Sequence, residues 1–99
     1  MTHEMLVALD VADPDVYQEY RAAMRPLLEA AGGGFRYDFE IARTLRAEAA
    51  HPINRVFTIF FRDRTAKDAF FGHPDYAVIR AQFFAKSVRA TTIVAEYER

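Results

Sequence analysis

The sequence predicts a single α+β domain of the ferredoxin-like class, with the element order β-α-β-β-α-β and an antiparallel four-stranded sheet. The first observation behind this prediction is periodicity: segments that alternate or run continuously apolar are interspersed with segments whose apolar residues recur at spacings of three and four. The second is length, because 99 residues fit one domain over 1–99 with one core. In this order the two helices lie on one face of the sheet.

The first strand is expected over Glu4–Ala12, where apolar character is nearly continuous. Asp13 and Pro14 then indicate a helix start, as the N-cap and the first helical residue. Apolar residues at helical spacing extend this helix to Ala31, with a kink expected at Pro26. Three consecutive glycines end it, because glycine adopts the left-handed conformation that a helix C-terminus favours.

The remaining elements follow from the same patterns and from the turn residues between them. Strands are expected over Phe35–Thr44, Asn54–Arg62 and Arg89–Tyr97. One helix is expected from Asp63 or Thr65 to Phe71, and another, started by Asp75 or Pro74, over Tyr76 to about Val88. The segment Arg46–Pro52 is polar and small and is expected to be a loop.

The apolar content points to a second contact surface. Hydrophobic residues make up 52% of the chain and aromatic residues 14%, which exceeds the needs of one small core. The first and third strands are apolar on both sides, as strands covered on both faces are. The helices can cover one face only, so a second copy of the same sheet is the simplest cover for the other. We therefore expect a homodimer formed through the sheet face.

The charge balance and residue usage exclude several classes of function. Thirteen basic residues against fourteen acidic ones give no excess of positive charge with which to bind nucleic acid or an anionic membrane surface. The absence of cysteine removes disulfides, thiolate metal sites and cysteine nucleophiles. No run approaches the length of a membrane span, and the N-terminus does not read as a signal peptide. We expect a cytoplasmic protein that needs no metal and no cofactor.

Three stretches of the chain, YQEYRAAMRPLLEAAGGGF, INRVFTIFFRD and FFGHPDYAVIRAQFF, carry a resemblance to a known family. Its markers are Tyr17 and Tyr20, the pair Gly32-Gly33, and Pro74-Asp75-Tyr76 followed by Arg80. The chain resembles the domain-of-unknown-function family thirteen-thirty (DUF1330) over nearly its whole length. The resemblance implies the dimeric α+β barrel superfamily, in which two ferredoxin-like sheets close into one barrel between subunits. Its relatives include cofactor-free monooxygenases and haem-degrading enzymes.

The chain also departs from the family pattern. The family often has a basic residue early in the second strand, which Arg36 matches, and a glycine at the end of that strand. The segment 41–45 contains no glycine.

Two carboxylates are candidate catalytic residues. Asp10 lies in an otherwise apolar strand, and buried carboxylates often mark functional sites because they are costly to bury. Glu40 belongs to a polar set in the second strand, where it alternates with Arg36 and Asp38 and is expected to share their face. Either carboxylate could act as a general base. The alternative is that this set keeps an edge strand soluble.

Six residues are candidates for substrate binding: Arg36, Tyr37, Asp38, His73, Tyr76 and Arg80. Arg80 could hold a ligand carboxylate bidentately, pair with Asp10, Asp38 or Glu40, or face solvent. His73 could ligate haem or simply bond a free carbonyl at a helix break. The tyrosines could line an aromatic pocket or place their hydroxyls at the rim of a filled core.

The three histidines have no spacing typical of a metal site, so no metal is expected. The leading functional hypothesis is a small homodimer that binds an apolar or aromatic molecule. Any chemistry would be cofactor-free oxygenation or proton transfer. The alternative is a non-enzymatic structural or interaction dimer whose core is filled by its own side chains.

Overall fold

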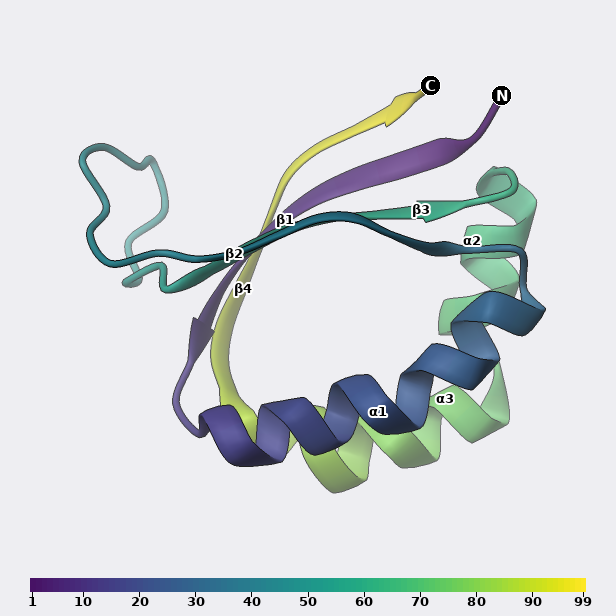
Figure 1. Ribbon diagram of the computed structural model, residues 1–99, viewed down its shortest axis with the longest axis horizontal. Coiled ribbons are helices and arrows are strands. Elements are labelled where there is room, and N and C mark those ends of the chain that lie inside the picture. The colour runs from purple at the N-terminus through teal and green to yellow at the C-terminus, as the bar shows by residue number, and fades with distance from the viewer.

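A computed structural model describes residues 1–99 as a sheet covered on one face by helices (Figure 1). The elements, in chain order, are β1 (His3–Val11), α1 (Pro14–Ala30), β2 (Gly34–Glu40), β3 (Arg55–Phe61), α2 (Arg64–Phe71), α3 (Pro74–Ile79), a π-helical turn (Arg80–Phe84), α4 (Ala85–Ser87) and β4 (Val88–Glu98). The predicted β-α-β-β-α-β order is confirmed. None of the helices has both the length and the apolar character that a membrane crossing requires.

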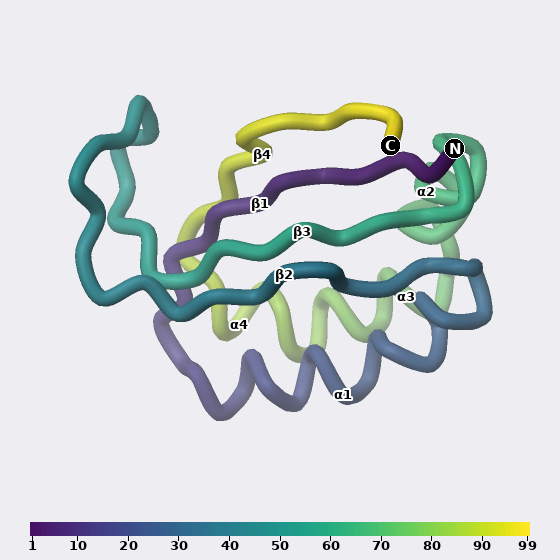
Figure 2. Tube along the Cα trace, turned by 45° about the horizontal axis from the view of Figure 1, so that its top comes forward, coloured from purple at the N-terminus to yellow at the C-terminus, as the bar shows by residue number.

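The sheet has the strand order β2-β3-β1-β4 and every neighbouring pair is antiparallel (Figure 2). The two doubly apolar strands, β1 and β3, are therefore central, as predicted. Their register places Val7 opposite Phe57 and Met5 opposite Ile59. The two chain ends lie side by side, where Thr2 and Arg99 exchange backbone hydrogen bonds of 2.7 and 2.8 Å.

Helix α1 begins and ends where the sequence predicts. The Asp13 side chain accepts a hydrogen bond from the Val16 amide, and Pro14 occupies the first turn. Pro26 lies inside the helix without ending it. Gly32 has a φ of 76°, a conformation that side-chain-bearing residues rarely adopt, and it turns the chain toward β2.

The core lies between the sheet and the helices. Its most deeply buried side chains come from β1, β3, α1 and α2 and include Leu9, Tyr17, Met24, Leu28, Phe61 and Phe70. Burying these large apolar and aromatic side chains is the main favourable term that holds the helices on the sheet. The opposite face of the sheet carries no helix (Figure 1) and is called the open face below.

The segment after α2 departs from the single helix expected from Tyr76 to Val88. The helix begins at Pro74, one of the two starts that the sequence indicates, and the His73 side chain caps it by accepting a hydrogen bond from the Asp75 amide. It then widens into the π-helical turn before β4 begins at Val88. Such turns insert a residue into a helix and are frequent at functional sites.

The second strand is shorter than expected, ending at Glu40 rather than Thr44. Residues 41–54 instead form a loop that projects beyond the sheet (Figure 1). The loop is tied back to β1 by the Asn54 side chain, which bonds both backbone groups of Val11. It is tied to β4 by a 2.6 Å hydrogen bond between His51 Nε2 and Thr92 Oγ1.

An irregularity in β2 overturns one expectation about side-chain directions. The register against β3 shifts between Phe35 and Tyr37, so Arg36 and Tyr37 point to the same face of the sheet instead of to opposite faces. Arg36 consequently bonds Glu4 on the open face, whereas Asp38 bonds Arg21 on the helix side. The expectation that these two β2 residues share one face is wrong, because a β-bulge reverses the alternation.

Candidate functional site

A cavity of about 280 Å³ lies between the sheet and the helices. Thirteen of its sixteen lining residues are hydrophobic, so the cavity favours an apolar guest. The lining residues come from the helix side of all four strands, from α1, α2 and α3 and from the π-helical turn: Met5, Val7, Leu9, Tyr17, Tyr20, Arg21, Met24, Phe35, Phe57, Ile59, Phe71, Tyr76, Arg80, Phe84, Thr91 and Ile93.

The cavity opens beside the edge strand β4. Among its lining residues, Thr91 and Ile93 of β4 and Phe71 and Arg80 of the helical layer are exposed, whereas most of the others are buried. These four residues form the mouth of the cavity. A small molecule can therefore reach the interior from the β4 edge of the sheet.

Arg21 is the buried charged group of the cavity wall, with 4% of its surface exposed. Its Nε donates a 2.8 Å hydrogen bond to the Tyr17 hydroxyl, and its terminal nitrogens donate to the Asp38 carboxylate at 3.1 and 3.4 Å. The guanidinium also lies over the Phe35 and Phe57 rings, 4.0 and 4.6 Å from their centroids. All of these contacts are internal, so Arg21 is held in place before any ligand binds.

The Asp38 carboxylate accepts these hydrogen bonds and offsets the positive charge of Arg21 in this part of the wall. It also receives two 2.8 Å hydrogen bonds from the Arg55 guanidinium. Burial by itself raises the pKa of the Asp38 carboxyl, but the hydrogen bonds from Arg55 and the charge of Arg21 outweigh burial and leave the pKa lowered. Asp38 is therefore an ionised, fully engaged partner and not a free base.

Two tyrosine hydroxyls meet at the helix side of the cavity. Tyr20 of α1 and Tyr76 of α3 lie 2.8 Å apart, oxygen to oxygen, and both side chains are buried. Burial raises the pKa of both phenols because it disfavours the phenolate. Both therefore remain protonated at neutral pH and act as hydrogen-bond donors.

Arg80 lies one helical turn after Tyr76, at the mouth of the cavity. Its guanidinium carbon lies 5.3 Å from the centroid of the Phe84 ring, and it contacts no carboxylate. The Phe84 ring in turn packs against Tyr20 with a centroid distance of 5.0 Å. The π-helical turn thus brings Arg80 and Phe84 beside the tyrosine pair. The expected ion pair of Arg80 with Asp10, Asp38 or Glu40 is not formed.

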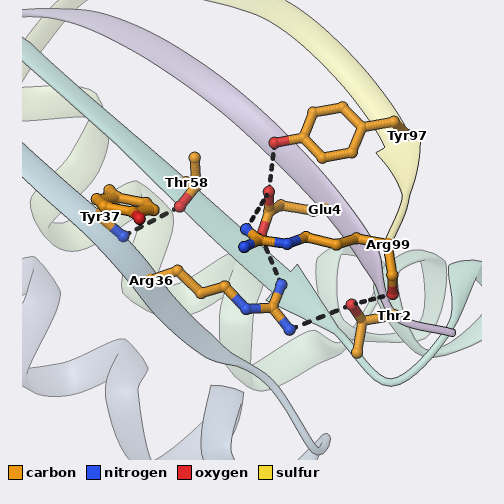
Figure 3. A network of polar contacts seen from close by, with 7 residues as sticks. All are labelled: Thr2, Glu4, Arg36, Tyr37, Thr58, Tyr97 and Arg99. Carbon is orange, nitrogen blue, oxygen red and sulfur yellow. Dashed lines mark hydrogen bonds and ion pairs between the residues drawn. The ribbon is translucent and has the colours of Figure 1, made fainter.

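A separate polar cluster lies on the open face, centred on Glu4 (Figure 3). The Glu4 side chain is 1% exposed, and its carboxylate accepts hydrogen bonds from Arg36, Tyr97 and Arg99. Burial raises the pKa of Glu4, but the bonds from Tyr97 and Arg36 and the charge of Arg99 leave it lowered. The open face therefore carries a buried, neutralised carboxylate instead of a bare apolar sheet.

Two of the expected site residues, Tyr76 and Arg80, line the cavity, and Asp38 lies just behind its wall. Arg36 and Tyr37 are on the open face, where Arg36 is engaged by Glu4 and the Tyr37 backbone amide bonds Thr58 (Figure 3). The structure therefore does not bring the six predicted binding residues together.

The two carboxylates considered as bases and His73 also lie outside the cavity. Asp10 is buried on the open face, 3.5 Å from Arg89. Glu40 ends β2 and lines a second, more open hollow of about 420 Å³ beside the loop. His73 caps α3 and lines a separate hollow between α1 and α2. No lining residue is an aspartate, glutamate or histidine.

Sequence reasoning missed Arg21 and the buried state of Glu4. The signal for Arg21 is its position in α1, four residues after Tyr17 and three before Met24, which places it on the buried stripe of the helix. Glu4 shares a face with the apolar residues Leu6 and Ala8 by strand alternation. A buried carboxylate there is costly without a charged or hydrogen-bonding partner, and this cost is the signal. No three histidine, aspartate or glutamate side chains come together as a metal site.

A family model described as a domain of unknown function (DUF1330) matches residues 5–97. No match is found among curated proteins. Among solved structures, a protein of unknown function from Rhodopseudomonas palustris is 18% identical with a TM-score of 0.79, over 99% of this chain and 82% of that one. A dimeric ferredoxin-like protein of unknown function from a Jannaschia species is 19% identical with a TM-score of 0.66, over 100% of both chains.

A third structure, from Nitrosomonas europaea, is provisionally assigned as an antibiotic biosynthesis monooxygenase. It is 16% identical with a TM-score of 0.59, over 99% of this chain and 89% of that one. At these identities the likeness establishes the ferredoxin-like fold.

Proposed function

The chain belongs to the DUF1330 family of domains of unknown function, and from its geometry we propose that it binds a small apolar or aromatic molecule in the cavity between sheet and helices. The observation that carries this proposal is the cavity itself, about 280 Å³ in volume and lined mainly by hydrophobic side chains. A well-formed apolar pocket with a few convergent polar groups is the usual form of a small-molecule site. A core filled by its own side chains would leave no such space.

Binding is better supported than catalysis. The cavity offers hydrogen-bond donors, the Tyr20–Tyr76 pair and Arg80, but its lining contains no carboxylate or histidine to act as a base. The raised pKa values of both phenols remove them as bases at neutral pH. Proton transfer or oxygenation would have to rely on the ligand's own reactivity, with these donors stabilising negative charge on it.

We further propose that the protein acts as a homodimer joined through the open face. Aromatic side chains remain exposed there: Tyr37 is 54% exposed, Phe39 50% and Tyr97 37%. Exposed aromatic surface of this kind is typical of an interaction site. The Jannaschia neighbour with the same fold is described as dimeric.

Binding in the cavity is tested by titrating the protein with N-phenylnaphthylamine, a neutral aromatic probe whose fluorescence rises in apolar surroundings. We expect saturable binding of one probe per chain. Thr91→Trp places a large ring at the exposed mouth and should weaken binding roughly tenfold or more, which is about 1.4 kcal/mol.

The matched control is Val78→Trp, which adds the same ring at an exposed α3 position outside the cavity lining. Its affinity for the probe should equal that of the unmodified protein. Equal affinity in all three proteins would mean that the probe binds elsewhere, and absence of saturable binding would refute the proposal.

A further inference from the structure

The charges around the cavity are unbalanced. Its lining contains two arginines and no acidic residue. Behind the wall, Asp38 pairs with both Arg21 and Arg55, and the charge of Glu40 also acts on Arg55, so these four charges balance. Arg80 at the mouth has no carboxylate partner at all. The cavity therefore presents a net positive charge to whatever enters it.

The uncharged polar groups of the cavity also offer a hydrogen-bond donor to a ligand. The hydroxyls of Tyr20 and Tyr76 carry two protons, and the single 2.8 Å hydrogen bond between them uses one. The other proton remains available to a bound acceptor. The Arg21 guanidinium, in contrast, is already held by three hydrogen bonds to Tyr17 and Asp38. Arg80 and the tyrosine pair are thus the groups that a ligand can engage.

These donors lie close enough to act on one group. Tyr76 and Arg80 are four residues apart on a helical segment, so their side chains lie on the same side of it. The Phe84 ring links Arg80 to the tyrosine pair, since it lies under the Arg80 guanidinium and packs edge-on against Tyr20. The positive charge of Arg80 also acts to lower the pKa of Tyr76, as expected for neighbouring groups.

We propose that the ligand is an aromatic or apolar anion of the carboxylate class, whose ring fills the cavity and whose charged group is held at the mouth by Arg80 and the Tyr20–Tyr76 hydroxyl pair. This inference rests on the proposed binding function and specifies its ligand. A planar guanidinium binds a carboxylate through two parallel hydrogen bonds. The apolar wall beside it excludes water and strengthens the pairing relative to one in open solvent.

The test compares three compounds that share one naphthalene ring and differ in charge: naphthoate, naphthylmethanol and naphthylmethylammonium. Each displaces N-phenylnaphthylamine from the protein at low ionic strength, and the dissociation constant is read from the displacement. We expect naphthoate to bind about fivefold to tenfold more tightly than the neutral alcohol, and the ammonium compound to bind most weakly. Added salt should narrow these differences, because the mouth is exposed.

Arg80→Gln should weaken the binding of naphthoate about fivefold to tenfold and the binding of the alcohol much less, so that the preference for naphthoate is lost. Arg80→Lys should keep part of the preference, because the charge remains and the bidentate geometry does not. Arg25→Gln is the matched control, since Arg25 is exposed on α1 outside the cavity lining. It should bind all three compounds as the unmodified protein does.

The outcomes separate this inference from the proposed function. If naphthoate and naphthylmethanol bind equally well, or if Arg80→Gln keeps the preference, the anion proposal is overturned and the cavity remains a binding site. If none of the compounds displaces the probe, both the anion proposal and the binding function fail.

Discussion

The hydroxyls of Tyr20 and Tyr76, 56 residues apart in the sequence, lie 2.8 Å from each other inside the protein. This contact joins α1 to α3 and fixes the helical side of the cavity. It also uses only one of the two phenolic protons. The same pair thus contributes to the stability of the fold and to the polar end of the proposed site.

Tyr20→Phe should lower the free energy of unfolding by about 1–2 kcal/mol, because it leaves the buried Tyr76 hydroxyl without its partner. Tyr76→Phe should have a similar effect, and the double variant should cost less than the sum of the two. Urea denaturation at fixed protein concentration measures all three. Tyr37→Phe is the control, since that side chain is exposed and should change stability by less than about 0.5 kcal/mol. Strict additivity would show that the hydroxyls do not interact.

Glu4→Gln should destabilise the protein by about 2 kcal/mol at neutral pH, because the buried carboxylate accepts bonds from Arg36, Tyr97 and Arg99. The folded-state pKa of Glu4 is lowered from 4.5, so its contribution is present above that value and lost as the pH falls through the lowered pKa. The variant should therefore lose less stability on acidification than the unmodified protein.

Urea denaturation from pH 7 to pH 3 measures this difference. Some acid sensitivity should persist in the Glu4 variant, because the pKa values of Asp38 and Glu96 are also lowered. Glu98→Gln, an exposed change on β4 next to Tyr97, should leave the curve unaltered. Parallel curves for Glu4→Gln and the unmodified protein would contradict the role of this carboxylate.

Phe39→Asp should convert the proposed homodimer to a monomer, since it places a charge in the aromatic surface of the open face. Light scattering coupled to size-exclusion chromatography measures the mass, which should fall from twice 11.4 kDa to that of one chain. Val78→Asp makes the same change at an exposed α3 position and should remain dimeric. A dimeric Phe39 variant, or a monomeric unmodified protein, would rule out an interface on the open face.

Gly33→Ala should destabilise the protein more than Gly32→Ala, although only Gly32 has a positive φ. A methyl group on Gly33 would lie 2.5 Å from the Phe60 carbonyl oxygen and 2.7 Å from Leu28 Cδ1, so the helix and sheet would have to separate. We expect a cost of about 2–3 kcal/mol there and about 1 kcal/mol at Gly32. Thermal or urea unfolding of the two variants ranks them, and the reverse order would contradict this packing.

Most of the fold could be predicted from the sequence because it depends on periodicity. The central placement of β1 and β3 follows from their two-sided apolar character, and the start of α1 follows from Asp13 and Pro14. Strand ends were less predictable. The alternation of apolar and polar residues continues past Glu40 only to Ile41, and the polar residues after it do not show that the chain leaves the sheet at Glu40.

The site was predictable only in part. Tyr76 and Arg80 carry a local signal, helical spacing beside a turn. The position of Arg36 depends on a β-bulge against β3, which involves the pairing of two strands and is not encoded in a period of two. The engagement of Arg21 by Asp38 is likewise a tertiary contact between α1 and β2.

The most direct measurement of the central claim is a crystal structure of the protein with bound naphthoate. The account predicts the ring in the cavity between the sheet and the helices, with its carboxylate within hydrogen-bond distance of the Arg80 guanidinium and of a hydroxyl of the Tyr20–Tyr76 pair. A ring in the cavity with its carboxylate turned away from Arg80 would contradict the anion proposal. Naphthoate bound on the open face, with the cavity unfilled, would contradict the account as a whole.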